Sequence, residues 1–119
     1  MREHLQYLVL KDIHLFQSWF HNMVGRREAE KRLARAGLYD GDFLVRLRKE
    51  DVTYVLSIVY HNEPKHYRIE KEFEHFSIEG GQKFMTLVEL IDHYHFRQDG
   101  LLYKLKRGIH NPDYNRTRS

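Results

Sequence analysis

The sequence predicts an α+β fold in which a small central antiparallel β-sheet is flanked by two α-helices, with a helical N-terminal extension. Three observations lead to this prediction. One segment with the periodicity of a helix precedes four short segments with the periodicity of strands, and a second helical segment follows them. The chain has 119 residues, the size of a single domain. No internal repeat, low-complexity segment or Pro/Gly-rich linker divides it.

The first predicted element is the extension, over residues 1–18. Its apolar residues have helical spacing and would share one face of a helix: Leu5, Leu8, Val9, Ile13 and Phe16. Residues 8–10, Leu-Val-Leu, are equally compatible with the start of a strand. We place the main domain at residues 19–108 and a C-terminal tail at residues 109–119.

The next predicted element is a helix from Arg26 to Ala36. Ala29 and Leu33 lie on its narrow apolar stripe, and Gly37 follows where a left-handed residue commonly ends a helix. Short turns then separate four predicted strands, which we expect to form an antiparallel meander. These strands cover residues 43–48, 54–60, 66–71 and 73–78.

A second helix is predicted from Thr86 to Arg97. Its apolar residues recur at i, i+3, i+4 and i+7, namely Leu87, Leu90, Ile91 and Tyr94. Thr86 and Glu89 have the spacing of a capping box at its start. With one helix before the meander and one after it, we expect one helix on each face of the sheet.

The composition excludes several classes of protein. Because the sequence has no Cys, it cannot form a disulfide framework, a zinc ribbon or a thiol nucleophile. No segment approaches the ~18 consecutive apolar residues of a membrane span, and the N-terminus has no secretory cleavage pattern. We therefore expect a cytosolic or nuclear protein, with the cytoplasm as the default. The 20 Lys and Arg exceed the 17 Asp and Glu only slightly, so the distribution of charge matters more than its sum.

Arg46 is the most informative residue of the sequence. It ends an apolar run, residues 43–46, inside the first predicted strand. Because strand side chains alternate, Arg46 shares a face with Leu44 and Arg48 and would point under a covering helix. A buried guanidinium cannot lose its proton and needs an anionic partner. No acidic residue of the first three predicted strands is placed to supply that charge.

Other basic residues are predicted to lie near Arg46. Arg26 begins the first helix, and His66 and Arg68 are two residues apart on the third predicted strand. If the first helix covers the Arg46 face, these groups and Arg48 converge on one patch without an acidic partner. An arginine fork suits phosphate oxygens. The depth of Arg46 favours phosphotyrosine, because the shorter phosphoserine would not reach it.

These residues carry a resemblance to a known family. The chain resembles a Src homology 2 (SH2) domain from residue 19 to about residue 105. The similar segments, in order, are 19–21 (Trp-Phe-His), 25–30 (Gly-Arg-Arg-Glu-Ala-Glu), 43–46 (Phe-Leu-Val-Arg), 54–57 (Tyr-Val-Leu-Ser), 66–69 (His-Tyr-Arg-Ile) and 99–101 (Asp-Gly-Leu). The resemblance implies a phosphotyrosine-peptide binding module of intracellular tyrosine-kinase signalling.

The resemblance also implies a role for each basic residue. Arg46 matches the arginine that grips the phosphate, and Arg26 matches its partner on the first helix. His66 matches the histidine that orders the pocket, and Arg68 the basic residue that packs on the phosphotyrosine ring. Many members have a hydroxyl where this chain has Arg48, so we expect charge and backbone N–H groups to hold the phosphate. The candidate phosphotyrosine-binding residues are Arg26, Arg46, Arg48, Lys49, His66 and Arg68.

A groove for the residues after the phosphotyrosine follows from the same resemblance. Ile78, Tyr94 and Leu101 would form an apolar pocket for an aliphatic side chain about three positions after the phosphotyrosine. Tyr94 and Leu101 could equally be ordinary core residues. The candidate groove residues are Tyr67, Ile78, Glu79, Tyr94, Gly100 and Leu101.

Within the family, residues 46–50, 79–84 and 99–103 look most similar to the C-terminal SH2 domain of the Syk/ZAP tyrosine kinase group. That group reads doubly phosphorylated tyrosine activation motifs through two SH2 domains in tandem. The resemblance therefore implies a ligand of the form phosphotyrosine-x-x-Leu/Ile and a neighbouring SH2 or kinase domain in a longer chain. It implies no cofactor.

Other functions fit parts of the sequence. An enzyme would need an activated nucleophile or a metal site, and His93 and His95 are too far apart around a helix to share a ligand face. A single-stranded nucleic-acid binder would expose aromatic residues along a basic groove, but Phe43 and Phe76 alternate like core residues. We therefore expect no catalysis, no metal and no nucleic-acid partner. Acidic-lipid binding by the basic patch stays open as an alternative.

Overall fold

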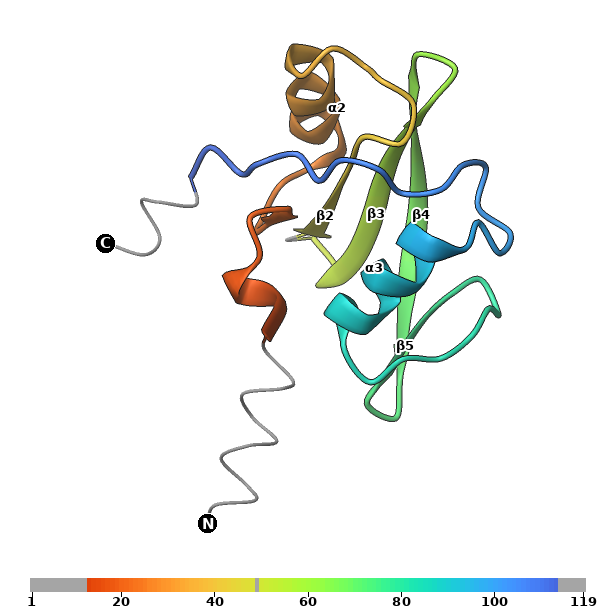
Figure 1. Ribbon diagram of the computed structural model, residues 1–119. Coiled ribbons are helices and arrows are strands. Elements are labelled where there is room, and N and C mark those ends of the chain that lie inside the picture. The colour runs from red at the N-terminus through yellow and green to blue at the C-terminus, as the bar shows by residue number, and fades with distance from the viewer. Residues whose placement is uncertain (1–12, 49, 114–119) are drawn as a thin grey trace.

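The computed structural model describes residues 13–48 and 50–113 of the chain. A five-stranded sheet runs through its middle in the order β1-β2-β3-β4-β5 (Figure 1). The strands are β1 (Phe20–His21), β2 (Phe43–Arg48), β3 (Thr53–Tyr60), β4 (Glu63–Glu72) and β5 (His75–Ile78). β1 pairs with β2 in parallel, and the other neighbours pair antiparallel.

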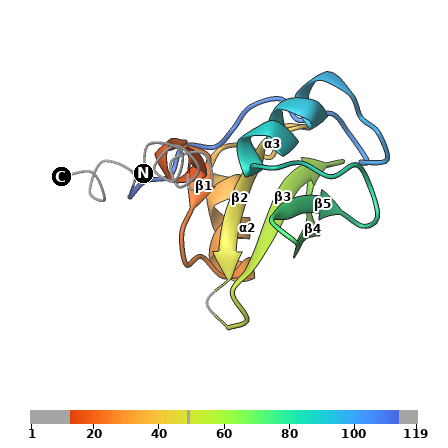
Figure 2. The same ribbon diagram turned by 90° about the horizontal axis from the view of Figure 1, so that it is seen from below.

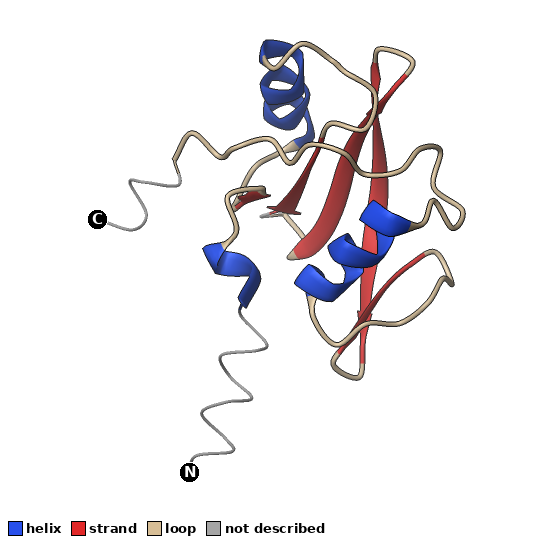
Figure 3. Ribbon diagram, viewed as in Figure 1, coloured by secondary structure: helices blue, strands red, loops and turns tan. Residues whose placement is uncertain are grey.

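Three helical segments accompany the sheet, as Figure 3 shows in blue. They are the 3-10 helix η1 (Ile13–Phe16), α2 (Arg26–Arg35) and α3 (Leu87–Phe96). The Thr86 half of the predicted capping box of α3 is present, because the Thr86 hydroxyl accepts a hydrogen bond from the Glu89 N–H at 3.0 Å. Gly37 follows α2 with a φ of 108°, a left-handed conformation that costs glycine little.

The two α-helices cover opposite faces of the sheet (Figure 2). On one face, Ala29 and Leu33 of α2 pack against Leu44 and Val59. On the other face, α3 packs against a larger cluster that includes Phe43, Leu56 and Ile58. Adjacent residues of one strand therefore belong to different cores, as the alternation of strand side chains requires. The predicted α+β fold, with one helix on each face, is confirmed.

The four predicted strands and both predicted α-helices are present, with ends that differ by up to three residues. The sequence did not indicate β1, because a strand of two residues shows no periodicity. The expected helix over residues 1–18 falls mainly on residues 1–12, which lie outside the described residues. Among the described residues, no helix combines the length and the apolar character needed to cross a membrane.

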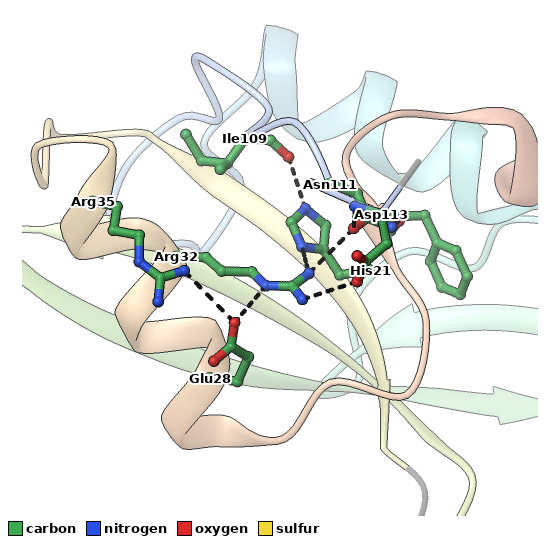
Figure 4. A network of polar contacts seen from close by, with 8 residues as sticks. His21, Glu28, Arg32, Arg35, Ile109, Asn111 and Asp113 are labelled. Atoms are coloured by element: carbon green, nitrogen blue, oxygen red, sulfur yellow. Dashed lines mark hydrogen bonds and ion pairs between the residues drawn. The ribbon is translucent and has the colours of Figure 1, made fainter. Parts of the chain in front are cut away.

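A polar network joins the C-terminal segment to β1 and α2 (Figure 4). Arg32 of α2 donates from Nη1 to His21 Nδ1 at 2.8 Å and to Asn111 Oδ1 at 3.2 Å. His21 uses its other ring nitrogen, Nε2, to donate to the Ile109 carbonyl at 2.8 Å. Ile109 and Asn111 are both buried, so residues 109–113 pack against the domain. The predicted domain boundary at residue 108 stays a prediction.

Candidate functional site

Arg46 lies near the end of β2 and is 3% exposed. Its Nε donates to Ser57 Oγ at 3.2 Å, its Nη1 to the Val24 carbonyl at 3.3 Å and its Nη2 to His66 Nδ1 at 3.4 Å. All three acceptors are uncharged. A guanidinium has five N–H groups, so one N–H on each terminal nitrogen has no acceptor among the described residues.

The register of the sheet brings these partners together. Leu44 pairs with Ser57, which pairs with His66, while Arg46 pairs through Val55 with Arg68. Residues opposite each other in a sheet point to the same face. Arg46, Ser57, His66 and Arg68 therefore share the face that α2 covers. This is the face on which the sequence predicted the basic patch.

The protons of the site can be assigned from its hydrogen bonds. His66 Nε2 lies 2.8 Å from Glu30 Oε2, and His66 Nδ1 lies 2.8 Å from Ser57 Oγ. Because a carboxylate only accepts, Nε2 must carry the proton. Nδ1 then accepts from the Ser57 hydroxyl and from Arg46. Ser57 Oγ in turn accepts from Arg46 Nε, so each group has one consistent role.

Glu30 corrects one expectation. The sequence predicts a basic patch without an acidic partner, because the first three strands supply no carboxylate at that position. Glu30, however, comes from α2. Its Oε2 contacts His66 and also lies 3.2 Å from Arg26 Nε. The hydrogen bond from His66, followed by that from Arg26, lowers the pKa of Glu30, so it is ionised at neutral pH. A carboxylate therefore lies within the patch, and it contacts two of the basic residues but not Arg46.

The electrostatic environment of Arg46 disfavours its charge. Burial lowers the pKa of Arg46, and the positive charges of Arg48 and Arg26 lower it further, while Glu30 and Glu50 oppose these effects. Burial also lowers the pKa of His66 below that of a free imidazole, although the hydrogen bond to Glu30 acts in the opposite sense. His66 is therefore neutral at neutral pH, and no carboxylate of the described segments forms an ion pair with Arg46. An external anion would relieve this unfavourable arrangement.

The other predicted phosphate-binding residues lie nearer the surface. Arg48 is half-buried and its Nε lies 3.6 Å from Asp51 Oδ1. Arg68 is exposed and lines a hollow of about 520 Å³ with Thr53 and Glu70, among others. Lys49 lies outside the described residues.

The candidate groove residues divide into two groups. Ile78, Tyr94 and Leu101 are 6%, 1% and 3% exposed and belong to the larger core cluster. Tyr67 lies on the same face, half-buried, and its hydroxyl accepts a hydrogen bond from the Leu102 N–H at 3.2 Å. The sequence left open whether Tyr94 and Leu101 are core or groove; both are core residues here, and a contact with peptide stays a prediction. Glu79 and Gly100 are exposed in the flanking loops.

Sequence reasoning missed three members of the site: Ser57, Glu30 and the Val24 carbonyl. Two of them had a signal. Glu30 is four residues after Arg26 and so lies on the same side of the helix. Ser57 is a polar residue in an otherwise apolar strand, on the same side as Val55 and Val59. The Val24 carbonyl had none, because backbone acceptors are the same in every residue.

Two further observations concern aromatic and metal-binding side chains. Phe43 and Phe76 are 0% and 2% exposed, so neither can act as a stacking platform for bases. Residues 13–48 and 50–113 contain no cluster of three or more His, Cys, Asp or Glu that could hold a metal ion.

Comparisons with known proteins concern the same part of the chain. The SH2 domain family matches residues 19–94. Tyrosine-protein kinase ZAP-70 of Homo sapiens is 37% identical over 105 residues, which is 87% of this chain and 17% of the relative. Tyrosine-protein kinase SYK of Gallus gallus is 34% identical over 99 residues, 82% of this chain and 16% of the relative. Growth factor receptor-bound protein 14 of Homo sapiens is 35% identical over 100 residues, 79% and 18% respectively. The chain spans less than a fifth of the length of these relatives.

Proposed function

Because the chain belongs to the SH2 domain family, whose members are non-catalytic phosphotyrosine-binding modules, we propose that its Arg46 pocket holds the phosphate of a phosphotyrosine peptide. The match confirms the family resemblance that the sequence motifs indicated. The individual roles of the pocket residues, the ligand sequence and the location of the protein belong to the proposal.

One observation carries the proposal. Arg46 is 3% exposed, is held by three uncharged acceptors and has two remaining N–H groups on its terminal nitrogens. Burying an unpaired guanidinium is unfavourable unless an anion completes it. Two parallel N–H groups match two oxygens of a phosphate. A phosphate on the long tyrosine side chain suits a fork at this depth.

The surrounding basic residues have separate roles in this proposal. Arg26 and Arg48 contribute positive charge beside the fork, which is why both lower the pKa of Arg46. Arg68 packs its aliphatic part on the phosphotyrosine ring, and His66 holds Arg46 in place. Lys49 follows Arg48 in the sequence and adds a further charge.

The finer specificity is also a proposal. We expect an aliphatic side chain about three positions after the phosphotyrosine to pack near Tyr67, Ile78 and Leu101, with Tyr94 beneath them and Glu79 and Gly100 at the edges. Since ZAP-70 and SYK are tyrosine-protein kinases, we propose that this module is cytoplasmic and acts beside a further SH2 domain or a kinase domain. A phosphotyrosine-x-x-Leu/Ile activation motif is the corresponding ligand.

Calorimetric titration with a phosphotyrosine-x-x-Leu peptide tests the proposal. We expect binding to this peptide and none to its unphosphorylated or phosphoserine forms. Charge-assisted hydrogen bonds are worth ~1.5–3 kcal/mol each, so loss of two in Arg46→Ala should weaken binding roughly a hundredfold or more. Replacing the Leu by Asp should weaken binding to the wild-type protein.

Arg35→Ala is the matched control for Arg46→Ala. Arg35 is also an arginine, but it is exposed at the end of α2, where its Nη1 lies 3.8 Å from Glu28 Oε2. We expect this variant to bind the phosphopeptide like the wild type. Equal affinities of the wild type and Arg46→Ala would contradict the assignment of the pocket.

A further inference from the structure

Glu30 connects to Arg46 through a chain of three hydrogen bonds. Glu30 Oε2 accepts from His66 Nε2 at 2.8 Å, His66 Nδ1 accepts from the Ser57 hydroxyl at 2.8 Å, and Ser57 Oγ accepts from Arg46 Nε at 3.2 Å. The chain runs from the surface of α2 to the buried end of β2. Glu30 itself does not touch the guanidinium, and its side chain is 37% exposed.

We propose that Glu30 is a positioning residue for phosphate recognition, because it selects the His66 tautomer that orients Ser57 and Arg46. The inference rests on the proposed function of the pocket. It assigns to an acidic residue a supporting role in a pocket that binds an anion.

The alternative tautomer of His66 does not fit this arrangement. With the proton on Nδ1, the ring would direct an N–H toward Arg46 Nη2, which is itself a donor 3.4 Å away. The unprotonated Nε2 would then face an oxygen of the Glu30 carboxylate at 2.8 Å, and two acceptors repel each other. Both faults disappear when Nε2 carries the proton. Glu30 therefore favours one tautomer by providing an acceptor and by penalising the other form.

Protonation of both ring nitrogens is also disfavoured. Burial lowers the pKa of His66, and the positive charge of Arg46 adds to this effect. His66 thus stays neutral, and its Nδ1 stays an acceptor. An acceptor at this point holds one terminal nitrogen of Arg46 from the side of β4, while the Val24 carbonyl holds the other. The guanidinium plane is fixed before an anion arrives, which lowers the entropic cost of binding.

Two substitutions separate the hydrogen bond of Glu30 from its charge. Glu30→Gln keeps an oxygen that can accept from His66 Nε2 but removes the negative charge. Glu30→Ala removes both. Glu28→Ala is the matched control, since Glu28 lies on the same helix but contacts Arg32 and Arg35 instead of the pocket.

The first readout is the tautomer of His66, measured without peptide by ¹⁵N NMR of the imidazole nitrogens at neutral pH. Protonated and unprotonated ring nitrogens have well-separated shifts. We expect the Nε2–H form in the wild type, in Glu30→Gln and in Glu28→Ala. In Glu30→Ala we expect a second population with the proton on Nδ1. An unchanged tautomer in Glu30→Ala would overturn the inference.

The second readout is calorimetric affinity for the phosphotyrosine-x-x-Leu peptide. We expect Glu30→Ala to bind about tenfold more weakly, the loss typical of one misplaced hydrogen bond to a charged group. Glu30→Gln should stay within about threefold of the wild type, because the acceptor is retained. Thermal unfolding of each variant checks that all are folded.

The outcomes separate this inference from the proposed function. If both Glu30 variants bind the peptide more tightly than the wild type, Glu30 is a competing anion and the inference is wrong, although the pocket assignment stands. If Gln and Ala weaken binding equally, the charge matters instead of the tautomer, and the inference is again wrong. If the wild type does not bind the peptide, the proposed function fails, and the NMR readout still decides the tautomer.

Discussion

Two arginine–histidine pairs within residues 13–48 and 50–113 differ in the remaining partners of the arginine. Arg32 of α2 contacts His21, and it also donates to Glu28 Oε2 at 2.9 Å, Asn111 Oδ1 at 3.2 Å and Asp113 Oδ2 at 3.4 Å. Arg46 of β2 contacts His66 but otherwise only a hydroxyl and a backbone carbonyl. The side chain of Arg32 is 9% exposed, so both guanidinium groups are largely removed from water.

This difference in partners indicates that Arg32 and Arg46 have different roles. Two carboxylates neutralise Arg32, and its contacts join α2, β1 and the C-terminal segment. Arg46 has neutral partners, unused N–H groups and further positive charge nearby. A buried pair with complete partners is typical of a structural contact, whereas an incomplete one leaves N–H groups that an external anion could accept from. Three predictions test this contrast.

Arg32→Met should have the largest effect on stability. The substitution leaves His21 Nδ1 without its donor and removes the Arg32 charge from Glu28 and Asp113. The two carboxylates are half-exposed and stay solvated, but a buried ring nitrogen left unsatisfied and the lost hydrogen bonds of Arg32 together cost about 3 kcal/mol of unfolding free energy. Chemical denaturation measures this loss, and calorimetry should show unchanged phosphopeptide affinity for the folded variant. A loss below about 1 kcal/mol would mean that the network contributes little.

Acidification should destabilise the domain through His21. Burial, with the Arg32 charge as a smaller cause, lowers the pKa of His21 from 6.5 to about 4. Between these values the unfolded chain binds a proton that the folded domain does not, so the unfolding free energy falls as the pH falls. The slope is about 1.4 kcal/mol per pH unit, or roughly 2–3 kcal/mol between pH 6.5 and pH 4.5.

Denaturant unfolding at several pH values, compared with His21→Gln, measures this effect. The variant should lose most of the slope in that range. His66, whose pKa is also lowered, should contribute in the same sense in both proteins. A wild-type slope equal to that of His21→Gln would show that His21 is not the group responsible.

Arg46→Met should have the smallest effect on stability, and in the opposite direction to Arg32→Met. Replacing a buried charge that lacks a counter-ion by an apolar side chain of similar length is commonly neutral or stabilising. The loss of the hydrogen bonds to Ser57 and to the Val24 carbonyl opposes this stabilisation. We therefore expect an unfolding free energy unchanged or raised by up to about 1 kcal/mol. A loss above about 2 kcal/mol would make Arg46 a structural residue like Arg32.

Much of the fold could be predicted because its signals are local. Leu87, Leu90 and Tyr94 mark one face of α3 through their spacing alone, and alternation assigns Phe43 and Leu44 to different faces of β2. Arg46 could be selected as a candidate binding residue for the same reason: a charged residue in an apolar strand contradicts the local pattern. The family motifs then suggested roles for Arg26, His66 and Arg68, which stay predictions.

Tertiary structure alone decided which groups that are far apart in the sequence come into contact. His21 and Ile109 are 88 residues apart, and no local pattern indicates that they form a hydrogen bond. The entry of Glu30 into the pocket depends on how α2 lies against β4, and the burial of Leu101 on how its loop packs against α3. The sequence by itself determined the elements, their apolar faces and a charged residue, Arg46, on a buried strand face, because these follow from periods of two and 3.6 residues. Partners, tautomers and burial depend on packing between distant segments, which only the folded chain defines.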